Sequence, residues 1–221
     1  MQMQRPSRLE KEEPIDALCH HFNVQPNQID TTNLGAALDM FVLRDAQMPT
    51  HALAVSQPDQ PTAPPLMLPI DATLFEQGFR LKLNLPAVLP GTTAPVPRLT
   101  GVPQALMVSL PVVHVTVPHV SSLPLLLLYG MRLETHPNIL AWSLLPVDVV
   151  EEFPNAAAMA LNLSRYRDDR FERIYRHNQG LWKNILSLGL NDTRILELVQ
   201  TAWNVTAEAR RIRQRSSSSR H

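Results

Sequence analysis

The sequence predicts an α+β protein that is mostly helical, with a small three-stranded sheet, a hairpin plus one further strand, packed against helices. Two observations support this prediction. Short apolar runs interrupted by prolines occupy the middle of the chain, whereas helical periodicity dominates its last third. Of the 20 prolines, 16 lie between Pro49 and Pro146, and none follows Pro154. With 221 residues, of which 44% are hydrophobic, the chain can bury a substantial core.

The N-terminal part of the chain, residues 1–48, predicts an arm and two helices. Residues 1–13 are polar and charged, which is typical of a loose arm. The proline that opens Pro14–Cys19 favours the first turn of a short helix. Apolar residues recur at helical spacing within Thr31–Asp45, so we expect a second helix there that ends before Pro49.

The middle of the chain, residues 49–150, predicts an α+β core. Apolar runs at 51–55 and 66–70 flank a proline-rich loop and predict a hairpin. Its second strand contains Pro69, so it is expected at an edge of the sheet. Residues 112–117 are almost entirely β-branched and predict the third strand.

Three helices and one long loop are predicted around these strands. Asp71 is placed to cap a helix over Ala72–Leu81. Leu85–Pro103 has no periodicity and predicts an extended surface loop. Two short apolar helices are expected over Leu123–Tyr129 and His136–Leu145.

The last third of the chain predicts a helical extension over residues 151–209, followed by a basic tail at residues 210–221. Asn155 is placed to cap the first helix, and Gly189 is placed to end the second. The three helices are expected over Ala156–His177, Asn178–Leu188 and Asp192–Arg213. Trp142, Trp182 and Trp203 are expected to anchor the cores of their helices.

Charge is divided unevenly along the chain, although the formal net charge is zero. Residues 1–164 carry 8 basic and 14 acidic side chains, and residues 165–221 carry 12 basic and 6 acidic. A uniformly basic surface for nucleic acid is therefore excluded. The arginine-rich tail is expected to serve nuclear import or to bind an acidic partner, unless it is only a solubilising helix end. Its contact residues are Arg210, Arg211, Arg213 and Arg215.

Two further features extend this interaction hypothesis. Phosphorylation of Ser216 or Ser217, which follow the arginines, would cancel positive charge locally. The apolar helix over 123–129 is a second candidate contact element, through Leu125, Leu126 and Tyr129. Burial is the default for so apolar a helix, and only an exposed patch there would form a partner site.

Residues that carry out chemistry are sparse, and we predict no catalytic residue, no metal site and no cofactor. The 7 glycines form no phosphate-binding loop, and the single cysteine excludes an intramolecular disulfide. His20 and His21 have no matching second pair of metal ligands. We interpret Cys19 as a small buried apolar residue. The alternatives are a hydrolase or transferase that uses Cys19 or a histidine, and a DNA-binding accessory protein that acts through the basic C-terminus.

Location is predicted from two absences. The N-terminus has no apolar signal segment, and the most apolar stretch is interrupted by prolines and histidines before it reaches the roughly 20 residues of a membrane span. We therefore expect an intracellular protein, in the nucleus or the cytoplasm, that does not insert into membranes.

Two segments resemble the clampless-type proteins of basidiomycete fungi. The first is LPVVHVTVPHVSSLPLLLLY, residues 110–129. The second is LWKNILSLGLND, residues 181–192, followed by LVQTAW, residues 198–203. In that family, a strand of the pattern LPVV-x-V-x-VP precedes a short apolar helix, and a W-x-N-x-x-x-LG segment precedes a further helix. The resemblance extends over residues 66–209.

The expected order of elements also resembles a divergent BTB/POZ domain, in which a hairpin, a helix, a strand and two helices precede a helical extension. Together the resemblances imply a non-enzymatic protein-interaction regulator of fungal sexual development. They imply a role in clamp-cell formation, dikaryon growth and the mating-type homeodomain pathway. The implied partners are other proteins, among them homeodomain or other transcription regulators, or a second copy of the chain. No cofactor and no catalytic residue are implied.

Overall fold

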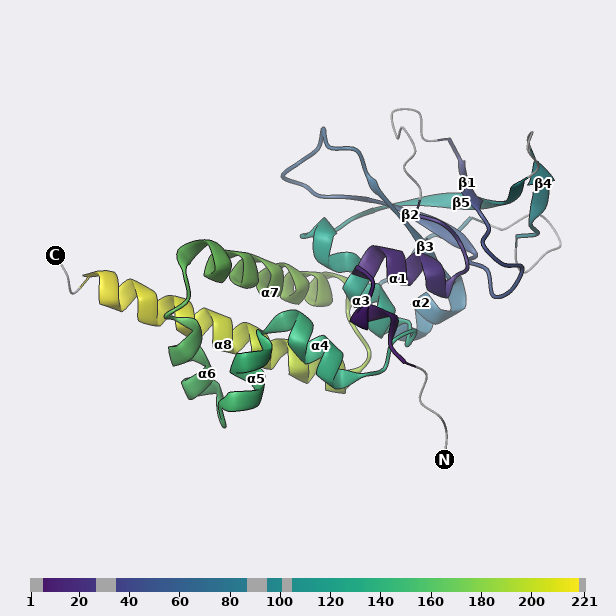
Figure 1. Ribbon diagram of the computed structural model, residues 1–221. Helices are drawn as coiled ribbons and strands as arrows, with labels where there is room; N and C mark the ends of the chain where they lie inside the picture. The colour runs from purple at the N-terminus through teal and green to yellow at the C-terminus, as the bar shows by residue number, and fades with distance from the viewer. Residues whose placement is uncertain (1–5, 27–34, 87–94, 101–104, 219–221) are drawn as a thin grey trace.

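The computed structural model describes residues 6–26, 35–86, 95–100 and 105–218, and it confirms the α+β class. A mixed sheet lies at one end of the molecule and a group of helices at the other, with three helices between them (Figure 1). The sheet contains β1 (Ala37–Phe41), β2 (His51–Ser56), β3 (Leu66–Ile70), β4 (Arg98–Thr100) and β5 (Ala105–Thr116).

The helices of the described residues fall into two groups. The group beside the sheet consists of α1 (Pro14–His21), α2 (Ala72–Gly78) and α3 (Leu123–Gly130). The group farther from the sheet consists of α4 (Pro137–Leu144), α5 (Val147–Glu152), α6 (Ala156–Leu163), α7 (Asp168–Leu188) and α8 (Thr193–Ser218). Two short 3₁₀ turns, η1 (Arg8–Glu10) and η3 (Val120–Ser122), precede α1 and α3.

The sheet has five strands in the described residues, not the three that the sequence predicted. Its order is β1-β5-β2-β3, and β4 also pairs with β5. β5 runs antiparallel to β1 and parallel to β2. β2 and β3 form the predicted hairpin, and β3 lies at the edge, where Pro69 removes no ladder bond from a second neighbour. The predicted strand at 112–117 is confirmed as the end of the 12-residue β5.

The predicted helix over Thr31–Asp45 is wrong for the residues that the structure describes, because they contain β1. Leu38 and Met40 are buried while their neighbours in the strand are exposed. A period of two residues fits these positions, and pairing of Leu38 with Leu110 in β5 selects the strand. Residues 31–34 of the predicted helix lie outside the described part of the chain.

The predicted loop over Leu85–Pro103 contains β4, which pairs with the first residues of β5. Residues 87–94 and 101–103 of that loop lie outside the described residues. The helix capped by Asp71 is confirmed, and the carboxylate accepts the Leu74 N–H at 2.9 Å. It ends at Gly78 rather than at Leu81, because the following backbone pairs with the segment after α7.

The helical boundaries of the last third differ from those predicted. Asn155 caps α6 as expected, accepting the Ala158 N–H at 2.9 Å, but α6 ends at Leu163. α7 then runs without a break past His177, where the sequence predicted the end of a helix. Asn178 does not interrupt α7, because its side chain donates to the Leu144 carbonyl at 2.9 Å. The short α5 was not predicted.

The sheet and α8 each extend across an expected segment boundary. β1 lies before residue 48, yet it pairs with β5 in the same sheet as the hairpin. α8 continues through residue 209 to Ser218. Gly189, at a φ of 70°, ends α7 as predicted, and α7 and α8 pack as the expected helical hairpin. Every helix in the described ranges is too short or too polar to span a membrane.

Candidate interaction surface

α3 lies in the core of the molecule, in contact with α1, α2 and α7. Leu125, Leu126 and Tyr129 are only 1%, 2% and 2% exposed. The Tyr129 hydroxyl is also occupied, since it donates to the His136 carbonyl at 3.0 Å. Exposure was the condition for a contact role of these three residues, and their burial removes them from the candidate surface.

Arg213, expected in a basic tail, holds the helices of the last third together. Its guanidinium donates to the carbonyls of Ser164 at 2.8 Å and Tyr166 at 2.7 Å, and it pairs with Asp168. It also stacks on the Phe171 ring, 4.7 Å from the ring centre. These contacts fill the turn between α6 and α7, which explains why the chain bends where one continuous helix was predicted. Arg213 therefore has a structural role.

Arg210 and Arg211, also expected in the tail, both lie within α8. The Arg210 guanidinium lies 4.3 Å from the centre of the Tyr175 ring, so this side chain packs onto α7. Arg211 is exposed and pairs with Glu208 at 3.0 Å, one turn earlier on the same helix. The positive charges of this region thus have different surroundings: Arg210 packs onto a ring, whereas Arg211 is directed to solvent.

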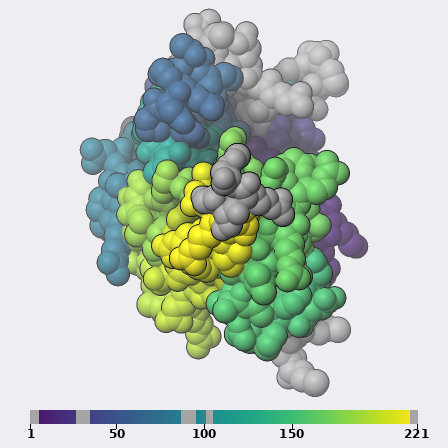
Figure 2. Space-filling model, turned by 90° about the vertical axis from the view of Figure 1, so that its left-hand side faces the viewer, coloured from purple at the N-terminus to yellow at the C-terminus, as the bar shows by residue number. Residues whose placement is uncertain are grey.

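The last turns of α8 carry Arg215, Ser216 and Ser217. Arg215 is exposed, and the Ser216 hydroxyl donates to the Ile212 carbonyl at 3.0 Å. Figure 2 shows the yellow end of α8 in the middle of one face of the molecule, beside the green surface of the neighbouring helices. Residues 219–221 of the expected tail lie outside the described residues.

An exposed tryptophan lies beside α7. Trp142 is 42% exposed, so the prediction that it anchors the core is wrong. Trp182 is partly buried against the core, and Trp203 is partly buried beside the Tyr175 ring, with the ring centres 5.3 Å apart. Trp142 borders a groove of about 250 Å³, which we call the Trp142 groove. Its lining residues are Trp142, Ser143, Leu144, Leu145, Pro146, Arg170, Arg173 and Ile174. Sequence reasoning missed this surface, because α4 shows too little periodicity to tell an exposed apolar position from a buried one.

Two arginines of the Trp142 groove, Arg170 and Arg173, follow one another at one-turn spacing on α7. Both are exposed, and neither has a carboxylate partner among the described residues. The acidic residues nearest in sequence are engaged by other arginines: Glu172 pairs with Arg176 at 3.0 Å and Asp169 with Arg167 at 3.5 Å. The groove therefore presents two positive charges beside an aromatic ring.

A second hollow, of about 440 Å³, shares Arg173 with the Trp142 groove and contains His119 and Ser121. The imidazole of His119 contacts two hydroxyls, Nδ1 with Ser122 Oγ at 2.9 Å and Nε2 with Ser121 Oγ at 3.2 Å. The side chain of Asn184 binds both the N–H and the carbonyl of His119. Burial lowers the pKa of His119, which favours the neutral imidazole.

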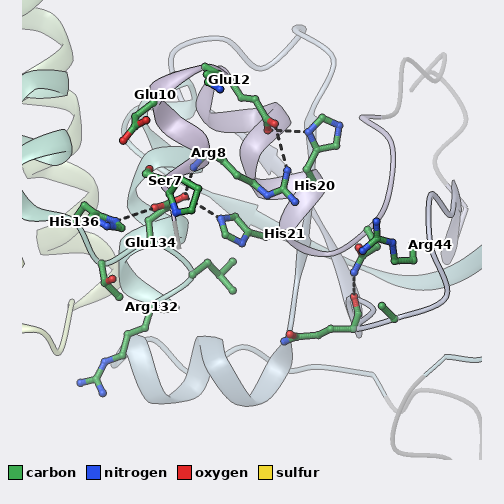
Figure 3. Close-up of a pocket in the computed structure, with 17 residues that line it drawn as sticks. Ser7, Arg8, Glu10, Glu12, His20, His21, Arg44, Arg132, Glu134 and His136 are labelled. Carbon is green, nitrogen blue, oxygen red and sulfur yellow. Dashed lines mark hydrogen bonds and ion pairs between the residues drawn. The ribbon is translucent and has the colours of Figure 1, made fainter. Parts of the chain in front are cut away.

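A third hollow, of about 870 Å³, brings together histidines and glutamates from segments far apart in sequence (Figure 3). At its centre Glu134, only 4% exposed, accepts the Arg8 backbone N–H at 3.0 Å. His21 Nε2 lies 3.1 Å from the same carboxylate, and His136 Nδ1 lies 3.8 Å from its other oxygen. We call these residues the Glu134 cluster. It ties the N-terminal segment to the loop after α3.

A second carboxylate and two residues with left-handed backbone conformations surround the Glu134 cluster. Glu12 contacts His20 Nδ1 at 2.8 Å and the Arg8 guanidinium at 3.3 Å, so this carboxylate is also satisfied. Asn23 and Arg132, with φ of 55° and 56°, both line the hollow and hold its loops in left-handed backbone conformations. In the described ranges no group of three His, Cys, Asp or Glu residues can hold a metal ion. The hydrogen bonds of Glu134 join the N-terminal segment to the loop after α3, so the cluster acts as an internal clasp.

Sequence reasoning singled out His20 and His21 but missed their partners. His21 and Glu134 are 113 residues apart, and no local spacing could connect them. Cys19, beside them in sequence, is fully buried, and burial raises the pKa of its thiol to about 12. The thiol is therefore neutral at ordinary pH, which disfavours Cys19 as a nucleophile.

No family model, no curated protein and no solved structure matches this chain.

Proposed function

We propose that this protein is a non-enzymatic module that binds other proteins through the Trp142 groove. The observation that carries the proposal is the exposed Trp142 beside Arg170 and Arg173, which have no carboxylate partner among the described residues. Tryptophan and arginine are the residue types that contribute most to binding energy at protein interfaces. Arg213, by contrast, binds carbonyls inside the molecule.

The finer part of the proposal rests on the resemblance to clampless-type proteins. We propose a regulator of fungal sexual development, acting in clamp formation, dikaryon growth and the mating-type homeodomain pathway, with transcription regulators as partners in the nucleus. The order of hairpin, α2, β5, α3 and α4 is the order that a divergent BTB/POZ-like domain requires, and this order supports the resemblance.

Affinity capture from fungal nuclear extract tests this function. The tagged full-length protein is compared with Trp142→Ala/Arg173→Glu and with Leu186→Ala, a matched control at a 64% exposed position of α7 outside the groove. We expect the wild type and the control to recover the same transcription regulators and the groove variant to lose them. Equal recovery by all three proteins would contradict a role of the groove.

The basic residues of α8 need a separate comparison. A chain that ends at Glu208 would remove Arg213 and shorten α8, so its loss of binding could reflect loss of structure. Arg211→Glu leaves the Arg213 contacts in place. If Arg211→Glu lost nuclear import or partner capture, that function would be assigned to the basic residues of α8. If import and capture were both unchanged, Arg211 would have no part in either.

One alternative function has a specific observation in its favour, the contact between Ser121 Oγ and His119 Nε2 at 3.2 Å. A hydrolase would use this pair as nucleophile and base. A fluorophosphonate probe tests it, with Ser121→Ala as the control. Labelling of the wild type alone would favour the enzyme, and no labelling is expected if the protein is an interaction module.

A further inference from the structure

We infer that the Trp142 groove binds an acidic segment of a partner protein that inserts one large apolar side chain. This inference rests on the proposed function and adds the chemistry of the partner. It depends on three properties of the groove: its size, the apolar residues inside it, and the positive charge at its rim.

The size and lining of the groove suit a single side chain. Its volume of about 250 Å³ is smaller than the roughly 300–1,000 Å³ of typical small-molecule sites. Of its lining residues, Leu144 and Leu145 are buried, and Pro146 and Ile174 are half-buried. The partly exposed ring of Trp142 completes an apolar surface that water covers in the free protein. A leucine or an aromatic side chain would displace this water.

The charge at the rim selects the residues that flank this apolar side chain. Arg170 is held over the Tyr166 ring, 4.3 Å from its centre, so its position is partly fixed before binding. Arg173 borders both the Trp142 groove and the hollow that contains His119 and Ser121. An arginine guanidinium binds a carboxylate with two parallel hydrogen bonds. Aspartate or glutamate on each side of the apolar residue would supply the missing partners.

A protein segment fits this surface better than a nucleic acid does. Asp168, Asp169 and Glu172 lie on the same first turns of α7 as the two arginines. Phosphates spaced along a nucleic acid would meet these carboxylates, and a nucleic-acid surface needs an uninterrupted basic stripe. A short acidic peptide can instead place its carboxylates at the two arginines alone.

Three synthetic peptides of twelve residues test the inference with purified full-length protein. The first has a central leucine flanked by glutamates, the second replaces the leucine by serine, and the third replaces the glutamates by lysines. Binding is measured by the anisotropy of a labelled peptide and by tryptophan fluorescence. We expect the first peptide to bind at least tenfold more tightly than either of the others, and more weakly at high salt.

Variants locate the binding site. Arg170→Glu/Arg173→Glu should weaken binding of the acidic peptide at least tenfold, whereas Arg194→Glu, an exposed arginine outside the groove, should not. Trp142→Phe should keep binding but abolish the change in tryptophan fluorescence. Circular dichroism of each variant at the binding temperature establishes that it is folded.

The outcomes separate this inference from the proposed function. Equal affinity for the acidic and the lysine peptide would overturn the inference that the groove binds an acidic segment. Full affinity of the acidic peptide for Arg170→Glu/Arg173→Glu would overturn it as well. If the protein formed concentration-dependent dimers that Arg173→Glu disrupts, the occupant of the groove would be a second copy of the chain. If duplex DNA competed with the acidic peptide, the occupant would be a nucleic acid. Either result overturns the inference. The proposed function has its own test. If Trp142→Ala/Arg173→Glu no longer captures the proteins that the wild type captures, the proposed function is supported even when the acidic peptide does not bind.

Discussion

Single residues determine how closely α7 approaches the segment before α3. Gly180 lies in the middle of α7, where glycine is unfavourable, and a Cβ there would lie 2.2 Å from Cγ of His119. The imidazole therefore occupies the space that a side chain would need. This close approach also brings Asn184 within reach of the His119 backbone.

Gly180→Ala is therefore expected to destabilise the protein, although alanine is the better helix former. Overpacking costs about 1–3 kcal/mol, more than the gain of about 1 kcal/mol in helix propensity. Urea denaturation of the wild type and the variant measures the difference in free energy of unfolding. A Cβ at position 180 would also lie 2.7 Å from the Cβ of His119, so the clash is relieved only when both the ring and the Cβ of residue 119 are removed. Gly180→Ala should therefore cost less stability in a His119→Gly background than in the wild type, and an equal loss in both backgrounds would refute the clash.

Glu134 is a second residue on which the packing depends, because its carboxylate holds the N-terminal segment in place. Glu134→Ala leaves the Arg8 N–H without its acceptor and removes the partner of His21. We expect a loss of about 1–3 kcal/mol in the free energy of unfolding, measured by urea denaturation. Glu10→Ala, an exposed glutamate that lines the same hollow, should change stability by less than about 0.5 kcal/mol. Equal effects of both variants would argue against the clasp.

At the scale of elements, α8 closes the helical end of the molecule by contacting α4, α6 and α7. Its buried stripe includes Val199, Ala202, Val205, Thr206 and Ala209. Helical spacing in the sequence predicts a buried stripe of six residues: Ile195, Leu196, Val199, Ala202, Trp203 and Thr206. Val199, Ala202 and Thr206 are buried, whereas the other three are partly buried. Arg213 extends the contact beyond the apolar stripe to the turn between α6 and α7.

Arg213→Ala should lower the free energy of unfolding by about 1–3 kcal/mol, because two carbonyls lose their donor. Arg213→Lys should restore little of this loss, since an ammonium cannot bind both carbonyls and stack on Phe171. Arg211→Ala, a solvent-exposed neighbour, is the control and should change stability by less than about 0.5 kcal/mol. Thermal denaturation followed by circular dichroism ranks the three variants. If Arg213→Ala did not change stability, the structural role would be refuted and Arg213 would again be a candidate partner contact.

At the scale of the whole molecule, stability should fall in mild acid. Burial lowers the pKa of His177, and the nearby His119 lowers it further. The unfolded chain, with an ordinary histidine pKa near 6.5, therefore binds more protons than the folded protein around pH 6. The free energy of unfolding should decrease as the pH falls from 7.5 through 6.5 to 5.5. Urea denaturation at these pH values measures the decrease.

His177→Gln should reduce this dependence on pH, because the group that takes up the proton on unfolding is gone. His114→Gln, at an exposed position of β5, is the matched control and should keep the wild-type dependence. An unchanged slope in His177→Gln would show that other groups cause the acid sensitivity.

The sequence by itself determined the fold class, the hairpin, the edge position of β3, two helix caps and the helical hairpin of α7 and α8. Each of these was predicted from a pattern of residues that lie near one another in the sequence. Only the tertiary structure decided that residues 37–41 form a strand, since β5 supplies the partners. It also decided which apolar and basic residues reach the surface. Helices α1, α2 and α7 pack against α3 and bury it, and the turn between α6 and α7 occupies Arg213, while Trp142 remains partly exposed. Local patterns cannot predict this, because burial is set by elements far away in the chain.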